Sequence, residues 1–305
     1  MLVEVGLFLL GLTLLVFGAD RAVRAGGELA LYYGVSPFFI GVTVISIGTS
    51  VPEMTTSIYA AYYGAGDLVV GNIVGSETSQ ITLAIAVVAL IAPIVTERKN
   101  VMVYGTAMLL AMIIMFLTLD DQVIGRSEGV LMMLAYAQFL YILYTSEGGE
   151  EITEEVVDTR EPPQRAIPWI FLGLVFIIGG GHLLVTNGVT IARLLAVPEY
   201  LVGLFTGLGT TAPEVVVAGI AAKEGSDISV GTILGSNITD PVFSLGVGAL
   251  VADVTIQDPG SVSLSLSYMI VVSLVVLSLM YWREGIDRRM AVLCLLLYLP
   301  SLLLY

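Results

Sequence analysis

The sequence predicts an all-α integral membrane protein with ten transmembrane helices, arranged as two inverted five-helix repeats. Three observations predict this class. Of the 305 residues, 57% are hydrophobic and only 12% are charged, the mean hydropathy is +0.95, and two similar polar motifs lie half a chain apart. A water-soluble domain of this length does not tolerate such a composition.

Ten apolar stretches are long enough to cross a bilayer. The first begins Met1-Leu2-Val3-Glu4 without a basic residue, so we expect a retained helix and not a cleaved signal peptide. The ten predicted spans run at about 2–19, 37–63, 67–92, 101–119, 128–145, 167–195, 200–222, 228–252, 261–282 and 288–305.

The positions of the twelve basic residues predict the orientation. The loops that would share one side of the membrane hold ten of the twelve, and only Arg126 and Arg193 fall on the other side. Cytoplasmic loops carry an excess of Lys and Arg. We therefore expect a multi-pass protein of the cell membrane with both termini extracellular and residues 146–166 in the cytoplasm.

Residues 146–166 differ in composition from the rest of the chain. The favoured interpretation is a solvated linker that its charge keeps out of the bilayer, and the alternative is a regulatory loop that gathers calcium. The net charge of −14 argues against a nucleic-acid partner. The acidic residues of this linker are Glu147, Glu150, Glu151, Glu154, Glu155, Asp158 and Glu161.

The two halves correspond residue by residue. Each repeat has an odd number of spans, five, so the two halves cross the membrane in opposite senses. The predicted domains are a first repeat at 1–145 with its motif region at 41–91, the linker, and a second repeat at 167–305 with its motif region at 203–250. The matches pair Gly26, Val35, Gly41, Glu53, Asp67, Gly71, Gly75 and Ser76 with Gly188, Val197, Gly203, Glu214, Asp227, Gly231, Gly235 and Ser236.

The first motif of each half places a carboxylate in an apolar segment. It reads Gly-Thr-Ser-Val-Pro-Glu up to Glu53 and Gly-Thr-Thr-Ala-Pro-Glu up to Glu214. An ionisable residue at membrane depth indicates a functional site. The proline before it removes a backbone donor, which predicts a discontinuous helix whose freed carbonyls line a cavity.

The second motif of each half adds further polar side chains. Ser76 shares a helix face with Gln80, and Ser236 shares one with Asp240. Oxygen ligands without Cys or His favour Ca²⁺ or Na⁺ over zinc or copper, and buried acids without basic partners need cations or protons as counter-charge. The candidate ligands are Glu53, Glu214, Asp240, Gln80, Thr49, Thr210, Ser50, Thr211, Ser76 and Ser236, with backbone carbonyls freed near Pro52 and Pro213.

These paired motifs resemble those of the calcium/cation antiporter superfamily, in its sodium/calcium exchanger family, over essentially the whole chain. The chain is similar to a compact microbial type, without the large regulatory domains of animal exchangers. The resemblance implies exchange of three Na⁺ for one Ca²⁺ by alternating access, no enzyme activity and no cofactor. The implied partners are the transported ions and the lipid bilayer, with no obligatory protein partner.

The resemblance also implies a role for each candidate. Glu53 and Glu214 would coordinate Ca²⁺ directly, aided by the carbonyls of Thr49 and Thr210. Na⁺ would use the same cluster with further hydroxyls and carbonyls, which belong to Ser50, Ser76, Thr211, Ser236, Ser46 and Gly207.

Several residues depart from the family pattern. Thr211 replaces the usual Ser, and Gln80 stands where sodium/calcium exchangers often have Asn and potassium-dependent ones have Asp. Glu77 is an extra acid that either adds a ligand or proton acceptor, or faces another polar crevice. His182 is either a pH sensor on a gate helix or a hydrogen-bonded packing residue. A proton/calcium antiporter, a potassium-dependent exchanger and, as a weaker alternative, a cation channel therefore stay open.

Overall fold

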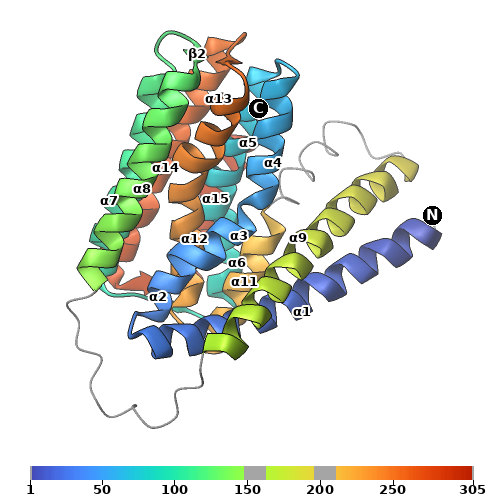
Figure 1. Cartoon of the computed structure of the whole chain (residues 1–305), viewed down its shortest axis with the longest axis vertical. Coiled ribbons are helices and arrows are strands. Elements are labelled where there is room, and N and C mark those ends of the chain that lie inside the picture. Colours follow the sequence, from blue (N-terminus) through green and yellow to red (C-terminus); the bar gives the residue numbers. More distant parts are fainter. Residues whose placement is uncertain (1, 148–162, 196–210, 304–305) are drawn as a thin grey trace.

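The computed structural model describes residues 2–147, 163–195 and 211–303, which are almost entirely helical (Figure 1). The elements of the first half are α1 (Leu2–Tyr33), α2 (Pro37–Ile40), a π-helical turn at Gly41–Ile45, α3 (Ser46–Thr49), α4 (Val51–Tyr62), α5 (Gly66–Ser79), a π-helical turn at Gln80–Ala84, α6 (Ile85–Ile91), β1 (Ile94–Val95), α7 (Arg98–Thr118), β2 (Val123–Ile124) and α8 (Arg126–Glu147). Those of the second half are α9 (Pro163–Leu194), α11 (Ala212–Lys223), α12 (Ile228–Thr239), a π-helical turn at Asp240–Ser244, α13 (Leu245–Val251), β3 (Val254–Thr255), α14 (Pro259–Arg283), β4 (Gly285–Ile286), α15 (Arg288–Tyr298) and a 3₁₀ helix at Leu299–Leu303.

Six helices among the described residues are long and apolar enough to cross a membrane, and a seventh crossing is added if the bent pair Pro37–Thr49 and Val51–Tyr62 is one span. In the other predicted spans, at about 200–222, 228–252 and 288–305, the described residues form shorter helices. The class of all-α membrane protein is therefore confirmed. The number of ten is not reached by single long helices, because several predicted spans are broken or begin outside the described residues.

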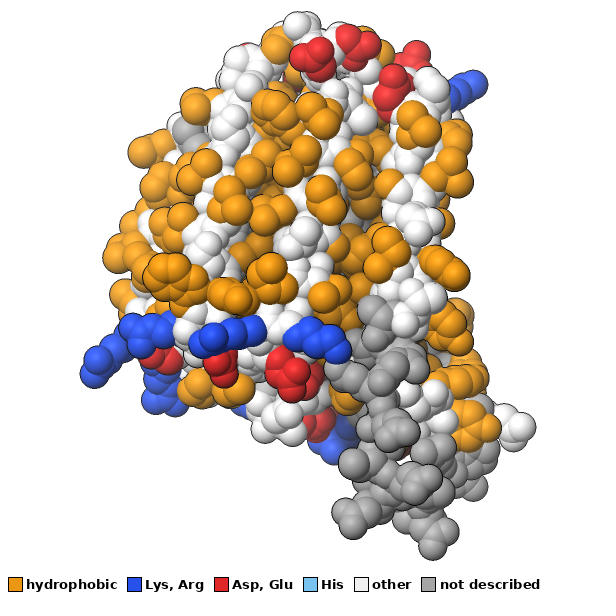
Figure 2. Space-filling view, turned by 90° about the vertical axis from the view of Figure 1, so that its left-hand side faces the viewer, with side chains coloured by type: hydrophobic (Ala, Val, Ile, Leu, Met, Phe, Trp, Pro, Cys, Tyr) orange, Lys and Arg blue, Asp and Glu red, His pale blue; other side chains and the backbone are white. Residues whose placement is uncertain are grey.

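The outer surface is suited to a bilayer. On the face in Figure 2, hydrophobic side chains cover the waist of the molecule, and Lys and Arg side chains gather in a band at one end. Large apolar side chains of several helices are exposed on the outside of the molecule: Leu131 is 64% exposed, Phe171 70% and Val271 57%. An apolar belt of this extent marks contact with membrane and not with water.

The first helix is longer than predicted. The sequence favoured a span at 2–19, but α1 continues unbroken through Arg24 to Tyr33. Arginine is a good helix former and does not end the helix, and the Arg24 guanidinium has two carboxylate partners. Its Nε lies 3.0 Å from Asp20 Oδ1 on the same helix, and its Nη2 lies 2.7 Å from Glu224 Oε1 beyond the end of α11.

Two long helices form a pair that leans away from the rest of the molecule. In Figure 1, α1 and α9 lie side by side and slant out from a bundle that holds most of the other helices. Glycines let their backbones touch: a Cβ on Gly18 would lie 2.6 Å from the Gly173 carbonyl oxygen, and one on Gly180 would lie 2.7 Å from that of Gly11. Close packing through small residues is typical of membrane helix pairs.

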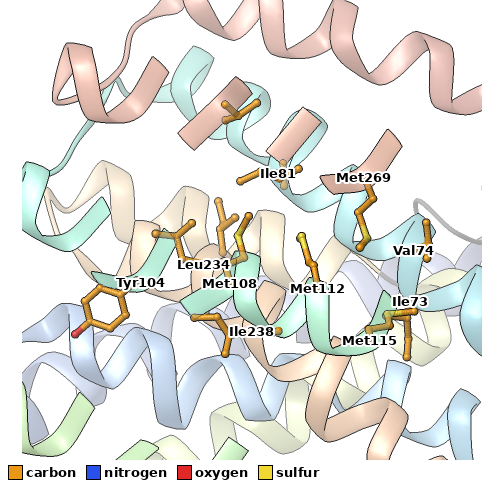
Figure 3. Close-up of a cluster of buried hydrophobic side chains, with 14 of the residues drawn as sticks. Ile73, Val74, Ile81, Tyr104, Met108, Met112, Met115, Leu234, Ile238 and Met269 are labelled. Atoms are coloured by element: carbon orange, nitrogen blue, oxygen red, sulfur yellow. The ribbon is translucent and has the colours of Figure 1, made fainter. Parts of the chain in front are cut away.

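The bundle has one dense apolar core that holds the polar segments in place. In Figure 3, Met108 and Met112 of α7 lie between Leu234 and Ile238 of α12 and the side chains of α5. Ile73 on α5 belongs to the same buried cluster. All five side chains are 0–1% exposed. Apolar packing therefore holds α5 and α12 in place, and these two helices carry the second polar motif of each half.

The connecting segments of the two halves pair with each other at both ends of the bundle. β1 pairs antiparallel with β4 at the start of α7, and β2 pairs antiparallel with β3 after its end. Arg98 Nη2 lies 2.9 Å from Glu284 Oε1 beside the first pair, and Gln257 N donates to Asp67 Oδ1 at 2.9 Å beside the second. Each end of the bundle is thus closed by one segment from either half.

Two aspartates cap the starts of α14 and α15. Asp258 Oδ1 accepts a hydrogen bond from Ser261 N at 3.2 Å before α14, and Asp287 Oδ1 accepts from Arg289 N and Met290 N before α15. The Ser261 hydroxyl also donates to Asp258 Oδ2 at 2.8 Å, and this bond lowers the pKa of Asp258 the most. The bond from Met290 N lowers the pKa of Asp287 the most. Both caps satisfy backbone donors that a helix start leaves open.

Candidate cation site

The first polar motif breaks its span as predicted. α3 ends at Thr49, Ser50 leaves the helical region with φ −77° and ψ 1°, and α4 begins at the next residue. The two pieces meet at a bend of 42°. Pro52 has no N–H to offer the carbonyl four residues earlier, so the ladder is weakened at this point. Glu53 follows in the first turn of α4, where the helix N-terminus favours negative charge.

A line of hydrogen bonds connects the two predicted motifs of the first half. Ser76 Oγ donates to Glu53 Oε1 at 3.2 Å, and Gln80 Nε2 donates to Ser76 Oγ at 3.0 Å. The Gln80 amide also reaches across to the second half, where its Nε2 lies 3.5 Å from Asp240 Oδ2. The shared helix face of Ser76 and Gln80, which the sequence predicted, is therefore confirmed.

Asn237 is a residue of this cluster that the sequence analysis did not select. Its Nδ2 donates to Gln80 Oε1 at 2.8 Å and to the Ile233 carbonyl oxygen at 2.8 Å. Gln80 therefore presents its amino group to the acids while its oxygen is held by Asn237. The available signal was the alignment of the two second motifs, in which Asn237 corresponds to Glu77.

Hydroxyl groups join the two halves on either side of this line. Thr49 Oγ1 lies 3.3 Å from Ser236 Oγ, and Ser79 Oγ lies 2.7 Å from Thr211 Oγ1. Asp240 Oδ1 accepts a hydrogen bond from Ser244 Oγ at 3.0 Å. The polar side chains of α3, α5, α12 and the start of α11 thus meet in one place, although they come from opposite halves of the chain.

The remaining acid of the predicted set lies in the same place. Glu214 stands in the first turn of α11, beside Thr49, and its carboxylate interacts electrostatically with those of Asp240 and Glu53. Ser50 lies against the Asp240 carboxylate. Sequence reasoning placed these groups at one depth because all of them fall near the middle of their spans, and the structure brings them together.

The predicted site residues are shielded from solvent. All of the described ones are 0–2% exposed, namely Ser46, Thr49, Ser50, Glu53, Ser76, Gln80, Thr211, Glu214, Ser236 and Asp240. Two further candidates, Thr210 and the carbonyl of Gly207, lie outside the described residues. The Ser46 carbonyl already accepts hydrogen bonds from Ser50 N at 2.9 Å and Thr49 Oγ1 at 3.2 Å.

The buried acids have no basic partner within the described part of the chain. The ion pairs found there join Arg24 and Arg98 to acids at the ends of the bundle. Burying carboxylates without a counter-charge is costly. No three acidic, His or Cys side chains of the described residues lie close enough to hold a metal by themselves. Hydroxyl and amide groups stand between the carboxylates, so a bound cation would need a mixed set of oxygens.

Two π-helical turns begin at predicted site residues. α5 passes into such a turn at Gln80, and α12 passes into one at Asp240, 160 positions later. A π-helical turn inserts an extra residue and redirects side chains, often at functional sites. In the second turn Pro241 follows Asp240 and cannot donate a backbone hydrogen bond. The first half has Ile81 at that place, so the turn forms there without a proline.

His182 plays no visible part in this site. It is exposed on α9, within the helix pair that leans away from the bundle. Both interpretations of His182, as a pH sensor or as a packing residue, therefore stay predictions.

A membrane-embedded bundle with an acidic cluster of carboxylates, hydroxyls and amides at the meeting point of two similar halves defines a transporter of cations. Residues 3–145 and 165–305 match the family described as sodium/calcium exchanger protein. The chain belongs to the sodium/calcium exchanger family. Its members are membrane antiporters of Ca²⁺ and other cations, they are not an enzyme family, and they need no cofactor.

Relatives resemble the chain over nearly its whole length. It is 32% identical over 302 residues to the putative antiporter CaxA of Alkalimonas amylolytica, covering 95% of this chain and 93% of that protein. It is 28% identical over 338 residues to the sodium/calcium exchanger MaX1 of Methanosarcina acetivorans, covering 97% and 96%.

A solved structure has the same fold. The chain superposes on the sodium–calcium exchanger NCX_Mj soaked with 10 mM Na⁺ and no Ca²⁺, with a TM-score of 0.83 and 29% identity, covering 99% of this chain and 98% of that one. Another structure of that exchanger was soaked with Na⁺ and Sr²⁺ and matches with a TM-score of 0.83 and 28% identity, covering 99% and 98%.

Proposed function

We propose that this chain is a secondary active antiporter that exchanges Na⁺ for Ca²⁺ across the cell membrane by alternating access. One observation carries the proposal. A buried set of oxygen donors, with three carboxylates and no basic partner among the described residues, lies where the two halves meet. Such a site needs cations as counter-charge, and oxygen donors favour Na⁺ and Ca²⁺.

In this proposal each site residue has a role. Glu53 and Glu214 bind Ca²⁺ directly with the carbonyls of Thr49 and Thr210, and Asp240 and Gln80 complete the middle of the site. A cation would compete with the bonds from Ser76 to Glu53 and from Gln80 to Ser76, so binding and rearrangement are coupled. Na⁺ would use the same cluster together with Ser50, Ser76, Thr211, Ser236 and the carbonyls of Ser46 and Gly207.

We further propose ten spans in two inverted repeats, with the domains at 1–145 and 167–305 and the cytoplasmic linker at 146–166. The recurrence of the element order supports this proposal. Both halves contain, in the same order, a bent or short helix, an interrupted helix, a strand, a long helix, a strand and a last helix. The α1–α9 pair would move across the bundle to open the site to either side. Ca²⁺, Na⁺ and the bilayer are the only partners that the proposal requires.

Labelling from the two sides of the membrane tests this topology. Single cysteines at positions 149 and 258, introduced by Gly149→Cys and Asp258→Cys in a Cys294→Ala background, should react with impermeant reagents from opposite sides, with position 149 cytoplasmic. The expectation follows from the alternation of the spans and from the basic loops. Reaction of both positions from the same side would contradict the proposed number of spans.

Gln80 predicts that exchange does not need K⁺. Its neutral amide faces Asp240, whereas potassium-dependent relatives would place an acid there. Wild-type proteoliposomes without K⁺ on either side should therefore keep their Na⁺-driven Ca²⁺ flux. Gln80→Asp would set two carboxylates against each other and should gain a K⁺ response, because a large monovalent cation relieves the repulsion.

Gln80→Asn is the matched control for this comparison, since it keeps the amide and should stay independent of K⁺. Collapse of the wild-type flux on removal of K⁺ would make the exchanger potassium-dependent and would contradict the role given to Gln80.

The proposed function is tested by Ca²⁺ uptake into proteoliposomes with imposed gradients of Na⁺, K⁺ or pH. Outward Na⁺ gradients should drive uptake against the Ca²⁺ gradient, and a pH or K⁺ gradient alone should not. Uptake that follows only the pH gradient would make the chain a proton/calcium antiporter. Uptake that needs no counter-ion would make it a channel.

A further inference from the structure

Glu77 is a fourth buried carboxylate that the proposed exchange cycle does not use. It lies on α5 directly after Ser76 and is 0% exposed. Neither of its carboxylate oxygens has a hydrogen-bond partner among the described residues. Glu53, by contrast, accepts from Ser76, and Asp240 accepts from Ser244. A buried carboxylate is stable only when another group meets its charge.

The correspondence of the two halves indicates which side chain is the counterpart of Glu77. At the offset of 160, Glu77 corresponds to Asn237, and Gln80 corresponds to Asp240. Asn237 and Gln80 contact each other across the two halves: Asn237 Nδ2 donates a hydrogen bond to Gln80 Oε1 at 2.8 Å. The corresponding pair is Glu77 and Asp240, whose carboxylates interact electrostatically. Neither of them can donate a hydrogen bond to the other.

The surroundings of Glu77 are negative. Its carboxylate interacts electrostatically with Asp240 most strongly, and with Glu53 and Glu214 as well. No Lys or Arg of the described residues pairs with any of the four. Asp240 Oδ2 has a long contact of 3.5 Å from Gln80 Nε2, and Ser50 also lies against this carboxylate. Both carboxylates therefore keep oxygens available for a cation.

We propose that Glu77 and Asp240 together form an additional Na⁺ subsite. The inference rests on the proposed exchange function and deepens it by one ion. Three monovalent cations balance Glu53, Glu214 and Asp240, and Glu77 adds a fourth negative charge that one more monovalent cation balances. Na⁺ fits because it takes carboxylate and hydroxyl oxygens and loses its hydration shell more readily than a divalent cation does.

Counting bound Na⁺ tests the subsite. The wild-type protein and two variants are purified and titrated with ²²Na⁺ in detergent without Ca²⁺. The variants are Glu77→Gln and Glu77→Asn, and asparagine is the residue found at the corresponding position of the second half. Both variants should bind one Na⁺ fewer per molecule than wild type at saturation, and should still bind Ca²⁺ through Glu53 and Glu214. Glu28→Gln, which neutralises an exposed acid on α1, should keep the full number.

The outcomes separate this inference from the exchange function itself. Equal Na⁺ numbers in wild type and in either folded Glu77 variant overturn the subsite, even if Na⁺/Ca²⁺ exchange is measured. Loss of Ca²⁺ and Na⁺ binding together in both variants also overturns it, since Glu77 would then serve the fold alone. If wild type binds the extra Na⁺ but shows no exchange in proteoliposomes, the subsite stands and the proposed function fails.

Discussion

Glu53→Gln and Glu214→Gln are each expected to abolish Ca²⁺ transport while leaving the fold intact. Each replacement keeps the size of the side chain but removes one charge from a fully buried site. Removing one partner of a buried ion pair costs roughly 3–5 kcal/mol, which corresponds to a loss of roughly 100- to 4,000-fold in Ca²⁺ affinity. The glutamine at position 53 still has an oxygen that can accept the bond from Ser76.

The measurement is ⁴⁵Ca²⁺ uptake into proteoliposomes driven by an outward Na⁺ gradient. Glu224→Gln is the matched control, since it neutralises an acid at the end of the bundle, in the ion pair with Arg24. It should retain uptake. Near-normal uptake by either site variant, at equal amounts of folded protein, would refute the assignment of Glu53 and Glu214 as Ca²⁺ ligands.

Gly231→Ala is expected to destabilise the protein, whereas Gly71→Ala, the same change at the corresponding position, is not. A Cβ on Gly231 would lie 2.4 Å from the Phe38 carbonyl oxygen and 3.2 Å from Gly41 Cα. The backbones of α12 and α2 would have to separate, at a cost of roughly 1–3 kcal/mol. A Cβ on Gly71 meets nothing within 4 Å, and Ala gains up to about 1 kcal/mol of helix propensity over Gly.

Thermal unfolding in detergent, followed by the reaction of Cys294 with a thiol dye, measures this difference. Cys294 is the single cysteine of the chain and is fully buried, so its labelling reports unfolding. Equal melting temperatures for the two variants would mean that α12 does not pack against α2 as described.

The polar site was largely predictable because the sequence motifs that mark it are short and distinctive. A carboxylate directly after a proline in an apolar segment has few structural uses, and its recurrence at Glu53 and Glu214 predicted both the broken helix and the meeting of the halves. The break at Ser50 and the hydrogen bonds of Ser76 and Gln80 confirm this reasoning.

What the sequence did not predict depends on contacts between distant segments. α1 runs past Arg24, whose guanidinium pairs with Glu224 of the other half. The partner of the Gln80 oxygen, Asn237, follows from the pairing of α5 with α12. The π-helical turn at Gln80 has no proline or glycine to announce it. Local residue preferences carry no information on such partners.

The central claim is that Na⁺ and Ca²⁺ share one buried site, and equilibrium competition tests it most directly. Purified protein loaded with ⁴⁵Ca²⁺ is titrated with Na⁺ at constant ionic strength. The proposal predicts complete displacement of Ca²⁺, with a steep dependence that requires more than one Na⁺ for each Ca²⁺ released. Ca²⁺ that stays bound at saturating Na⁺ would show two separate sites and would contradict the account.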